Sequence, residues 1–403
     1  MPAAVPRRVG FFGLLGSGNT GNDASLAALL TALRTRYPDA ELSCMCAGPS
    51  EIATRYGLPT TPMHWYSADD TRSRTAVVRK AFGKLADAFR TAAWVRRHDV
   101  VMVPGMGVLE ATLPLRPWGV PYALVLLGLA GRCFGTKVAY VCVGAAYTTQ
   151  PVTRYLIAMA ARLAHYRSYR DALSKAAMTR MGVDTTGDHV YADLAFALPA
   201  PEPTGGRGRT VGVGVMAYHG TTLDRRQADT IHDTYRTTLR GFVAWLAEHG
   251  YAVRLFIGDA VDEHVTRAIV DQLPAHGDVT VVPTTTYDDL LRAMADVDYV
   301  VASRYHNLLA ALLLGRPTVS ISYAEKNDAL LADAGLADFC HPLRSLHLSR
   351  LVTSFDRLAA ERDDLVADIR EANARNAQRL EEQFHDLATT LFAEPAQPSV
   401  QPS

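Results

Sequence analysis

Short apolar runs alternate with longer amphipathic stretches along most of the chain. Runs rich in β-branched residues are typical of buried strands, whereas apolar residues spaced by three and four positions are typical of helices. The predicted strands of the first half are residues 9–15, 41–46, 100–103, 137–143, 166–169 and 190–194. Helices are predicted over residues 24–37 and 151–163, and from Arg170 and Asp171 to Gly182. This alternation predicts a parallel sheet with helices on both faces.

The same pattern restarts after residue 210. Strands are predicted at 211–216, 252–257, 279–282, 299–302 and 318–322, and helices at 229–249, 288–296 and 304–314. Residues 198–210, LPAPEPTGGRGRT, are rich in Pro and Gly as linkers are. We therefore predict two doubly wound, Rossmann-like domains at 1–198 and 211–345 with an interdomain cleft. A linker is predicted at 199–210, a helical segment at 346–392 with one helix over 354–392, and a disordered tail at 393–403.

Composition narrows the classes of partner. The formal net charge is zero, so the chain as a whole is not attracted to nucleic acid or to anionic lipid, although local basic patches remain possible. The hydrophobic content of 48% is that of a globular protein. The five cysteines are scattered and odd in number, without a metal-binding spacing, which favours buried thiols in a reducing compartment. The apolar run 120–130 is too short to span a bilayer, and the N-terminal run resembles a strand more than a signal peptide. A cytoplasmic protein without a transmembrane segment or bound metal is expected.

Residues 298–326 have the strongest pattern of functional chemistry. We expect Ser303 to cap a helix that ends before Gly315 and Pro317, which places Arg304 and His306 in its first turn. Backbone N–H groups and the helix dipole make such a turn favourable for anions. Tyr323 and Lys326 follow the next strand. Because ligands collect at the carboxyl ends of parallel strands, these side chains are predicted to form one anion site.

Two glycine-rich turns follow predicted strands in the first half. GSGNTGNDAS, residues 16–25, satisfies G-x-G-x-x-G through Gly16, Gly18 and Gly21. A dinucleotide site also needs an acid at the end of the next strand, but the strand 41–46 has its only acid at the start. NAD binding is therefore not favoured. The second turn, PGMGVLE, ends at Glu110.

Several segments together resemble one known family. They are GSGNTGNDA, VPGMGVLE, SYRDALS followed by GV and ADLAFAL, IGDAVDEH, and ASRYHNLLAALLLGRPTVSISYAEK. In this order, over about residues 9–345, they resemble the polysaccharide pyruvyl transferase family. The last segment is similar to that family's S/G-x-R-x-H, G-x-P and Y-x-x-K signature.

The resemblance implies both a fold and a reaction. Members resemble two-domain glycosyltransferases of the GT-B kind and transfer the enolpyruvyl group of phosphoenolpyruvate to sugar hydroxyls, usually as a pyruvate ketal in polysaccharide biosynthesis. It implies no metal, no nucleotide and no cofactor beyond the donor substrate. Arg304 and His306 match motif residues associated with the phosphoenolpyruvate site, and Lys326 matches the motif lysine.

The chain departs from the family pattern at two positions in its first half. Asn22 stands where many members have Asp, so a carboxylate role there would pass to Asp23. Met106 replaces a glycine of the usual triple-glycine turn and narrows the room beside the backbone. Both positions lie in the domain expected to hold the acceptor, so the donor site is the better supported of the two.

These patterns assign candidate roles. His306 is expected to protonate the enol carbon because its charge state changes near neutral pH. The base for the sugar hydroxyl is Asp23, Glu110 or Asp193, with Asp23 slightly preferred. Arg170 could bind an anion or form a buried ion pair. The expected substrate-binding residues are Arg304, Lys326, Ser303, Tyr323, Asn19, Gly21, Glu110 and His219.

Other readings of the same residues remain open. The basic cluster could bind the diphosphate of a UDP- or GDP-sugar in a GT-B glycosyltransferase. The chain could be a catalytically silent binding subunit of its family, or could act on a small molecule in secondary metabolism. The expected partners are phosphoenolpyruvate and a saccharide or glycoconjugate acceptor. A lipid-linked acceptor, met at the inner face of the membrane, is one option.

Overall fold

The computed structural model describes residues 8–65, 76–110, 117–202, 208–220, 224–273 and 278–392. The predicted tail at 393–403 and residues 203–207 of the predicted linker lie outside this range. The chain divides into two compact units. The first unit is Met1–Ser17, Ser25–Leu194 and Gln378–Ser403, and the second is Gly18–Ala24 and Ala195–Ala377. The domains predicted from sequence are contiguous. In the structure, by contrast, Gly18–Ala24 groups with the second unit and the end of the chain, from Gln378, groups with the first.

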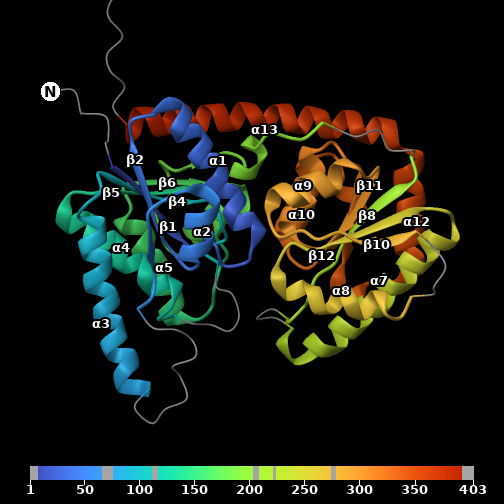
Figure 1. Ribbon diagram of the computed structural model, residues 1–403, viewed down its shortest axis with the longest axis horizontal. Coiled ribbons are helices and arrows are strands. Elements are labelled where there is room, and N and C mark those ends of the chain that lie inside the picture. The colour runs from blue at the N-terminus through green and yellow to red at the C-terminus, as the bar shows by residue number, and fades with distance from the viewer. Residues whose placement is uncertain are drawn as a thin grey trace, which may run out of the picture. The chain divides into compact units, whose positions relative to one another are not determined.

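The first unit is built on a parallel sheet with the strand order β3-β2-β1-β4-β5-β6-β7 (Figure 1). Its strands are β1 (Arg8–Gly13), β2 (Glu41–Cys46), β3 (Thr60–Pro62), β4 (Val100–Pro104), β5 (Lys137–Val143), β6 (Tyr166–Tyr169) and β7 (His189–Val190). Its helices are α1 (Thr20–Arg36), α2 (Pro49–Tyr56), α3 (Ala76–Val95), α4 (Val120–Phe134), α5 (Pro151–Leu163) and α6 (Ala172–Arg180). The order reverses between β1 and β4. Right-handed crossovers therefore place α1 and α2 on one face of the sheet and α4 and α5 on the other.

The second unit repeats this plan with the strand order β10-β9-β8-β11-β12-β13. Its strands are β8 (Thr210–Gly214), β9 (Ala252–Phe256), β10 (Val279–Val281), β11 (Tyr299–Ala302), β12 (Thr318–Ser322) and β13 (Cys340–Pro342). Its helices are α7 (Ala228–Glu248), α8 (Glu263–Val270), α9 (Tyr287–Ala295), α10 (Tyr305–Leu313), α11 (Glu325–Asp333) and α12 (Leu348–Ala360). α7 packs with α8 and α12, and α10 packs with α9 and α11 (Figure 1). The predicted doubly wound, Rossmann-like architecture of both halves is confirmed.

Most predicted elements are found within a few residues, and three predictions need correction. The strand expected at 190–194 is β7, His189–Val190, and a 3-10 helix follows at Leu194–Ala197. The single helix expected over 354–392 is two helices, α12 and α13 (Arg362–Thr390), which are separated at Glu361. The helix expected to begin at Ala24 begins at Thr20, so that half of the first glycine-rich turn is helical.

A buried polar network holds the end of α13 within the first unit. The Oε1 atom of Gln383 accepts hydrogen bonds from Ser168 at 2.6 Å and from the Cys142 thiol at 3.2 Å. Asp386 accepts from the hydroxyl groups of Tyr166 and Tyr191 at 2.7 and 3.0 Å. Since buried polar groups are costly unless hydrogen-bonded, this network fixes how α13 packs there.

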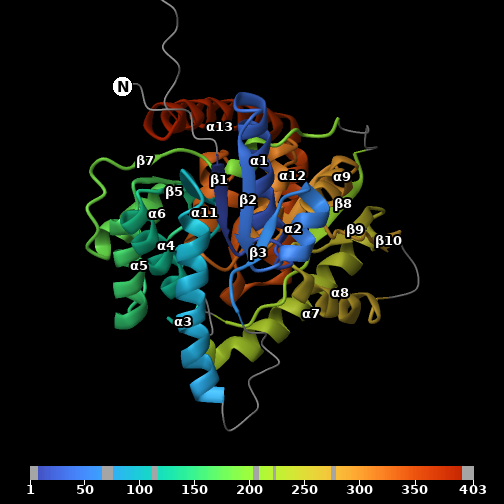
Figure 2. The same cartoon turned by 60° about the vertical axis from the view of Figure 1, so that its left-hand side comes forward.

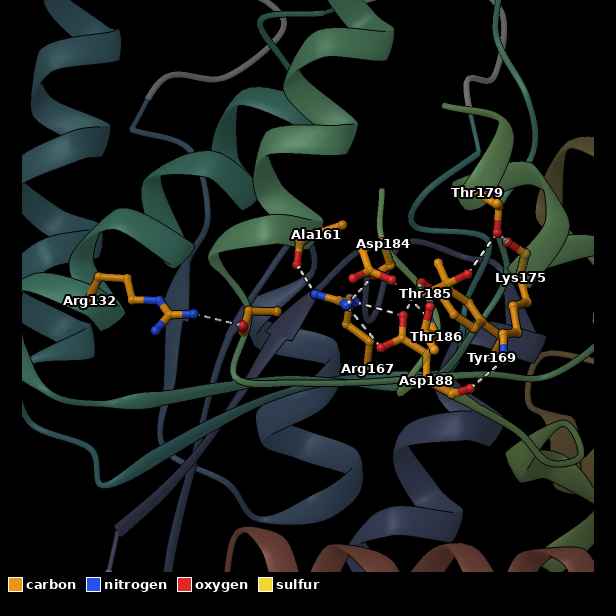
Figure 3. Close-up of polar contacts among 11 residues, drawn as sticks. Arg132, Ala161, Arg167, Tyr169, Lys175, Thr179, Asp184, Thr185, Thr186 and Asp188 are labelled. Atoms are coloured by element: carbon orange, nitrogen blue, oxygen red, sulfur yellow. Dashed lines mark hydrogen bonds and ion pairs between the residues drawn. The ribbon is translucent and has the colours of Figure 1, made fainter. Parts of the chain in front are cut away.

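A second network ties the edge of the first sheet together (Figure 3). Arg167 of β6 donates from Nε and Nη2 to the Asp188 carboxylate at 2.8 and 2.9 Å, and from Nη1 to the Ala161 carbonyl at 2.8 Å. Tyr169 and Lys175 also donate to Asp188. All of these donors have protein acceptors, so the cluster joins β6 to its neighbours and plays a structural part.

Candidate functional site

The carboxyl ends of β8 and β11 define the point at which the strand order of the second sheet reverses. β8 pairs in parallel with both β9 and β11, and β11 pairs with β12. In open α/β sheets, ligands bind outside the carboxyl ends of the strands at this reversal. The loops that follow β8, β9, β11 and β12 therefore form the candidate site, and the predicted residues Arg304, His306, Tyr323 and Lys326 all lie in or just after them.

The N-cap residue of α10 is Arg304 and not Ser303, which corrects the sequence prediction. Arg304 has extended φ and ψ angles of −69° and 132°, and its carbonyl accepts from Asn307 and Leu308. Ser303 is fully buried and its hydroxyl donates to Tyr235 at 3.3 Å. The Ser303 hydroxyl therefore bonds to Tyr235 of α7 and does not cap α10. Arg304 precedes the helix and His306 lies in its first turn, so that the two side chains can serve one ligand.

The guanidinium of Arg304 is held by a buried carboxylate. Its Nε and Nη2 atoms donate to the two oxygens of Asp262 at 2.9 and 2.6 Å. The Asp262 side chain is 0% exposed, whereas 22% of the Arg304 side chain remains exposed. Asp262 also accepts from the Ala217 backbone N–H at 2.8 Å. Burial disfavours the charged guanidinium, but the hydrogen bonds and charge of Asp262 prevail and raise the pKa of Arg304. Arg304 is thus a fixed cation.

Asp259 is a second acid beside Arg304. Its carboxylate accepts from the Val261 N–H at 3.3 Å and from Asn19 Nδ2 at 3.4 Å. Burial raises the pKa of Asp259 above its usual value, although the nearby positive charge of Arg304 opposes this rise. Neither Asp259 nor Asp262 was singled out from the sequence. Both lie in IGDAVDEH after β9, and that position at a strand end was the signal that could have identified them.

The short segment Gly18–Ala24 brings the first glycine-rich turn into the second unit. Asn19 caps α1, because its Oδ1 accepts from the backbone N–H groups of Gly21 and Asn22 at 3.2 and 3.3 Å. Thr20 donates from its hydroxyl to the Gly258 carbonyl at 3.0 Å. Asn19 therefore holds the helix start and, through Asp259, the loop after β9.

Gly21 and His306 are in direct contact. A Cβ atom added at Gly21 would lie 2.0 Å from Nδ1 and 2.1 Å from Cγ of the His306 ring, so only glycine leaves room for the imidazole in this position. The ring also meets Tyr305 and Tyr287 edge to face, at centroid separations of 5.2 and 6.4 Å. Two predicted site residues from distant parts of the sequence are thus brought together.

Lys326 and Tyr323 extend the same group of side chains. The Lys326 ammonium lies 5.8 Å from the centroid of the Tyr323 ring and 5.9 Å from that of Tyr305. Such cation–π contacts hold an ammonium group without neutralising its charge. His219, by contrast, is exposed in the loop that follows β8. The positive charge of the site rests on Arg304 and Lys326.

The candidate bases have different surroundings. Glu110 and Asp193 lie in the first unit, where Arg170 donates to them at 3.0 and 3.2 Å. Arg170 also lies 3.5 Å from Asp171, and its side chain is only 2% exposed. The predicted alternative of a buried ion pair for Arg170 is therefore observed. Asp23 is 3% exposed and lies in the first turn of α1, the same turn as Gly21.

Met106 lies in the second glycine-rich turn and has an unusual backbone conformation. Met106 has a φ of 59°, in the left-handed region that favours glycine. Its side chain is 2% exposed, and a Cβ atom at Gly13 would lie 2.4 Å from the Met106 Cε. Met106 therefore fills the space beside β1.

Among the residues that the structure describes, no three His, Cys, Asp or Glu side chains are grouped as a metal site would require.

Solved structures of similar fold include three proteins from bacterial sources. UDP-GlcNAc 2-epimerase from Neisseria meningitidis bound to UDP-GlcNAc has a TM-score of 0.58 at 11% identity, over 95% of this chain and 99% of that chain. HepE from Anabaena in complex with UDP-glucose has a TM-score of 0.59 at 13% identity, over 95% and 99%. MurG from Acinetobacter baumannii has a TM-score of 0.55 at 15% identity, over 94% and 100%. This likeness confirms the GT-B-like fold.

Sequence comparison identifies the family. No curated protein sequence gives a significant match to the chain. The family described as polysaccharide pyruvyl transferase does match, over residues 19–325, a range that begins at Asn19 and includes Arg304, His306 and Tyr323. This range covers well over half of the chain and includes strands of both parallel sheets. The protein therefore belongs to the polysaccharide pyruvyl transferase family.

Proposed function

We propose that the protein transfers the enolpyruvyl group of phosphoenolpyruvate to a saccharide or glycoconjugate and forms a pyruvate ketal. The observation that carries this proposal is the convergence of Arg304, His306 and Lys326 at the strand-order reversal of the second sheet. Phosphoenolpyruvate has a carboxylate and a phosphate, so its site needs more than one cation together with N–H donors. The family supports the same chemistry.

Arg304 and Lys326 would divide the donor between them. Since Nε and Nη2 of Arg304 bond to Asp262, the Nη1 end of the guanidinium is the part that can face a ligand. The N-terminus of α10 adds backbone donors and a positive dipole. Asp262 offsets much of the charge of Arg304, and Lys326 would add a second positive charge for the phosphate. Asp262 is a positioning residue that holds Arg304 in place.

His306 would act as the acid. It would give a proton to the methylene carbon of phosphoenolpyruvate, which becomes a methyl group and leaves an oxocarbenium-like centre at C2. One sugar hydroxyl then bonds to C2 and loses its proton to a base. A second hydroxyl then bonds to C2 while the bond between C2 and the phosphate oxygen breaks, and its proton leaves with the phosphate as hydrogen phosphate, which completes the ketal. Gly21 would support this step by allowing the imidazole its place.

Asp23 is the base that we favour. Glu110 and Asp193 both accept hydrogen bonds from Arg170 in the first unit, away from His306 in sequence and in unit. Asp23 lies in the same helical turn as Gly21, which contacts His306. No metal or cofactor enters this scheme, and that expectation stays a prediction.

Two other functions remain as alternatives. A nucleotide-sugar glycosyltransferase is favoured by one observation: the similar structures include complexes with UDP-GlcNAc and UDP-glucose. A catalytically silent family member is suggested by Asn22 and by Met106 in its left-handed conformation. Intact Arg304, His306 and Lys326 speak against the silent form.

The test is a product assay with defined acceptors. The full chain is incubated with phosphoenolpyruvate and a panel of sugars, nucleotide sugars and lipid-linked saccharides, and both phosphate release and product mass are recorded. We expect equimolar phosphate and a product heavier by one ketal-linked pyruvyl group. Transfer of a sugar from a nucleotide sugar, with no phosphate from phosphoenolpyruvate, would establish the glycosyltransferase instead.

A further inference from the structure

Exposed aromatic side chains are unevenly divided between the two units. Among the described residues, the largely exposed aromatics are Trp65, Phe82, Phe89, Trp118, Phe134 and Tyr155, and all belong to the first unit. The exposed large hydrophobics of the second unit are Val261, Val281 and Leu348. Isolated exposed apolar residues are normal on protein surfaces, but a group of aromatics confined to one region indicates an interaction surface.

The densest part of this group lies on α3. Phe82, Leu85 and Phe89 are exposed by 61%, 60% and 76% and are spaced by three and four positions, so they form one stripe along the helix. Trp65 packs edge to face against Phe82 with the ring centroids 5.9 Å apart. We call these four residues the α3 face. Figures 1 and 2 show the N-terminal end of α3 extending beyond α4 and α5 in the first unit.

A neighbouring tryptophan widens the apolar surface. Trp118, which is 59% exposed, packs against Tyr122 of α4 with the ring centroids 5.9 Å apart. The Tyr122 hydroxyl in turn donates to the Lys84 carbonyl of α3 at 3.4 Å. Tryptophan is the residue type most suited to the boundary between lipid headgroups and acyl chains, because its ring is both apolar and polar.

The charge of α3 indicates what kind of surface it would bind. Its sequence, AVVRKAFGKLADAFRTAAWV, has four basic residues and one acid. That acid, Asp87, is 3% exposed and accepts from the Trp65 backbone N–H at 2.7 Å. Lys84 and His64 also lie within ion-pair distance of it. The net charge of the helix is therefore positive, which complements an anionic surface.

We propose that the α3 face, with Trp118, docks the protein on an anionic lipid bilayer. Basic helices with exposed Phe, Leu and Trp side chains lie in the interface of such bilayers, with the apolar face among the acyl chains. A projecting ridge can enter a lipid surface without a matching groove. None of the described helices is long and apolar enough to cross a membrane, so the contact is peripheral.

Co-sedimentation with vesicles tests this proposal without any substrate. The full chain is mixed with phosphatidylglycerol vesicles and with phosphatidylcholine vesicles. We expect it to pellet with the former and to be released by salt. The variant Phe82→Ser/Phe89→Ser removes two exposed rings and should lower the partition coefficient at least about tenfold. Its melting temperature should be unchanged because both rings are exposed.

A matched control separates the α3 face from general hydrophobicity. Leu173→Ser/Val190→Ser removes two exposed apolar side chains elsewhere in the first unit and should bind vesicles as the parent protein does. Equal loss in both double variants would overturn the proposal, as would a parent protein that stays in the supernatant with anionic vesicles. A dimer that depends on Phe82 and Phe89, seen by light scattering in the absence of vesicle binding, would assign the face to self-association instead.

Discussion

Arg170 and Arg304 occupy similar places in the two units, each just beyond the carboxyl end of a parallel strand, β6 and β11. Arg170 has a side chain that is 2% exposed and lies against three acids, Glu110, Asp171 and Asp193. Arg304 has a single forked partner, Asp262, and 22% of its side chain stays exposed. The same residue type at the same edge of the fold is thus enclosed by acids in one unit and stays partly exposed in the other.

The number of charged partners explains this difference. Three carboxylates lie within ion-pair distance of the Arg170 guanidinium, whereas one bidentate carboxylate fixes the direction of the Arg304 guanidinium. The edge of the second sheet also carries Lys326 beside two tyrosine rings. Among the described residues, we therefore propose the second unit as the place of the anion site, and the variants below test this difference between the units.

The largest effect is expected at Arg170. Arg170→Met leaves Glu110 and the 1% exposed Asp193 side chain without their cation, which should lower the free energy of unfolding by about 3–5 kcal/mol. The control is Arg36→Met, which loses a surface ion pair with Glu381 and should cost less than about 1 kcal/mol. Chemical denaturation of both variants provides the measurement. Equal losses would mean that burial of Arg170 has no energetic weight.

The next largest effect is expected at Gly21 and concerns catalysis. Gly21→Ala places a methyl group against the His306 ring, and a displacement of about 1 Å at a catalytic group can reduce turnover about 100-fold. Gly187→Ala is the control, because a Cβ atom there meets nothing within 4 Å. Initial rates of ketal formation should fall only for the first variant. Unchanged turnover in Gly21→Ala would separate Gly21 from His306.

Substitutions at Met106 test the left-handed backbone conformation of this residue, which follows β4 of the first sheet. Met106→Gly and Met106→Ala both remove the buried side chain, but only glycine is unstrained at a φ of 59°. The glycine variant should therefore be more stable than the alanine variant by about 1 kcal/mol. At most helical and strand positions the order is reversed. Thermal melts that rank alanine above glycine would contradict the left-handed conformation.

The smallest effect concerns pH. Burial raises the pKa of Asp259, so the folded chain binds a proton more tightly there than the unfolded chain. The charged form therefore lowers stability at neutral pH, and this cost disappears as pH falls through the raised pKa. Asp259→Asn should raise the melting temperature at pH 7, with a smaller gain at acidic pH. A gain independent of pH would show that the charge is not responsible.

Much of the fold can be predicted from the sequence because its strands are local and apolar. The strands 41–46, 137–143, 166–169, 299–302 and 318–322 match at both ends, since each is a short run bounded by turn residues. The break at Glu361 was missed because neither glycine nor proline marks it. Both sides of it have strong helix formers, so only tertiary packing ends α12.

The site was predictable as a set of residues but not as a set of contacts. Arg304, His306 and Lys326 follow strand ends and match a family signature, which places them at the same edge. The fork between Arg304 and Asp262 joins residues 42 positions apart, and the bond between Ser303 and Tyr235 spans 68. Local patterns do not contain such pairings, so the partner that fixes Arg304 and the error at Ser303 both required the structure.

The most direct measurement is the thermal shift caused by phosphoenolpyruvate in the parent protein and in Arg304→Lys. Lysine keeps a cation beside Asp262 but cannot form the fork, so the chain should fold without the rigid guanidinium. The control is Arg292→Lys, at an arginine whose side chain is 69% exposed. We predict that phosphoenolpyruvate stabilises the parent and the control, and fails to stabilise Arg304→Lys. Stabilisation by a UDP-sugar but not by phosphoenolpyruvate, or an undiminished shift in Arg304→Lys, would contradict this account.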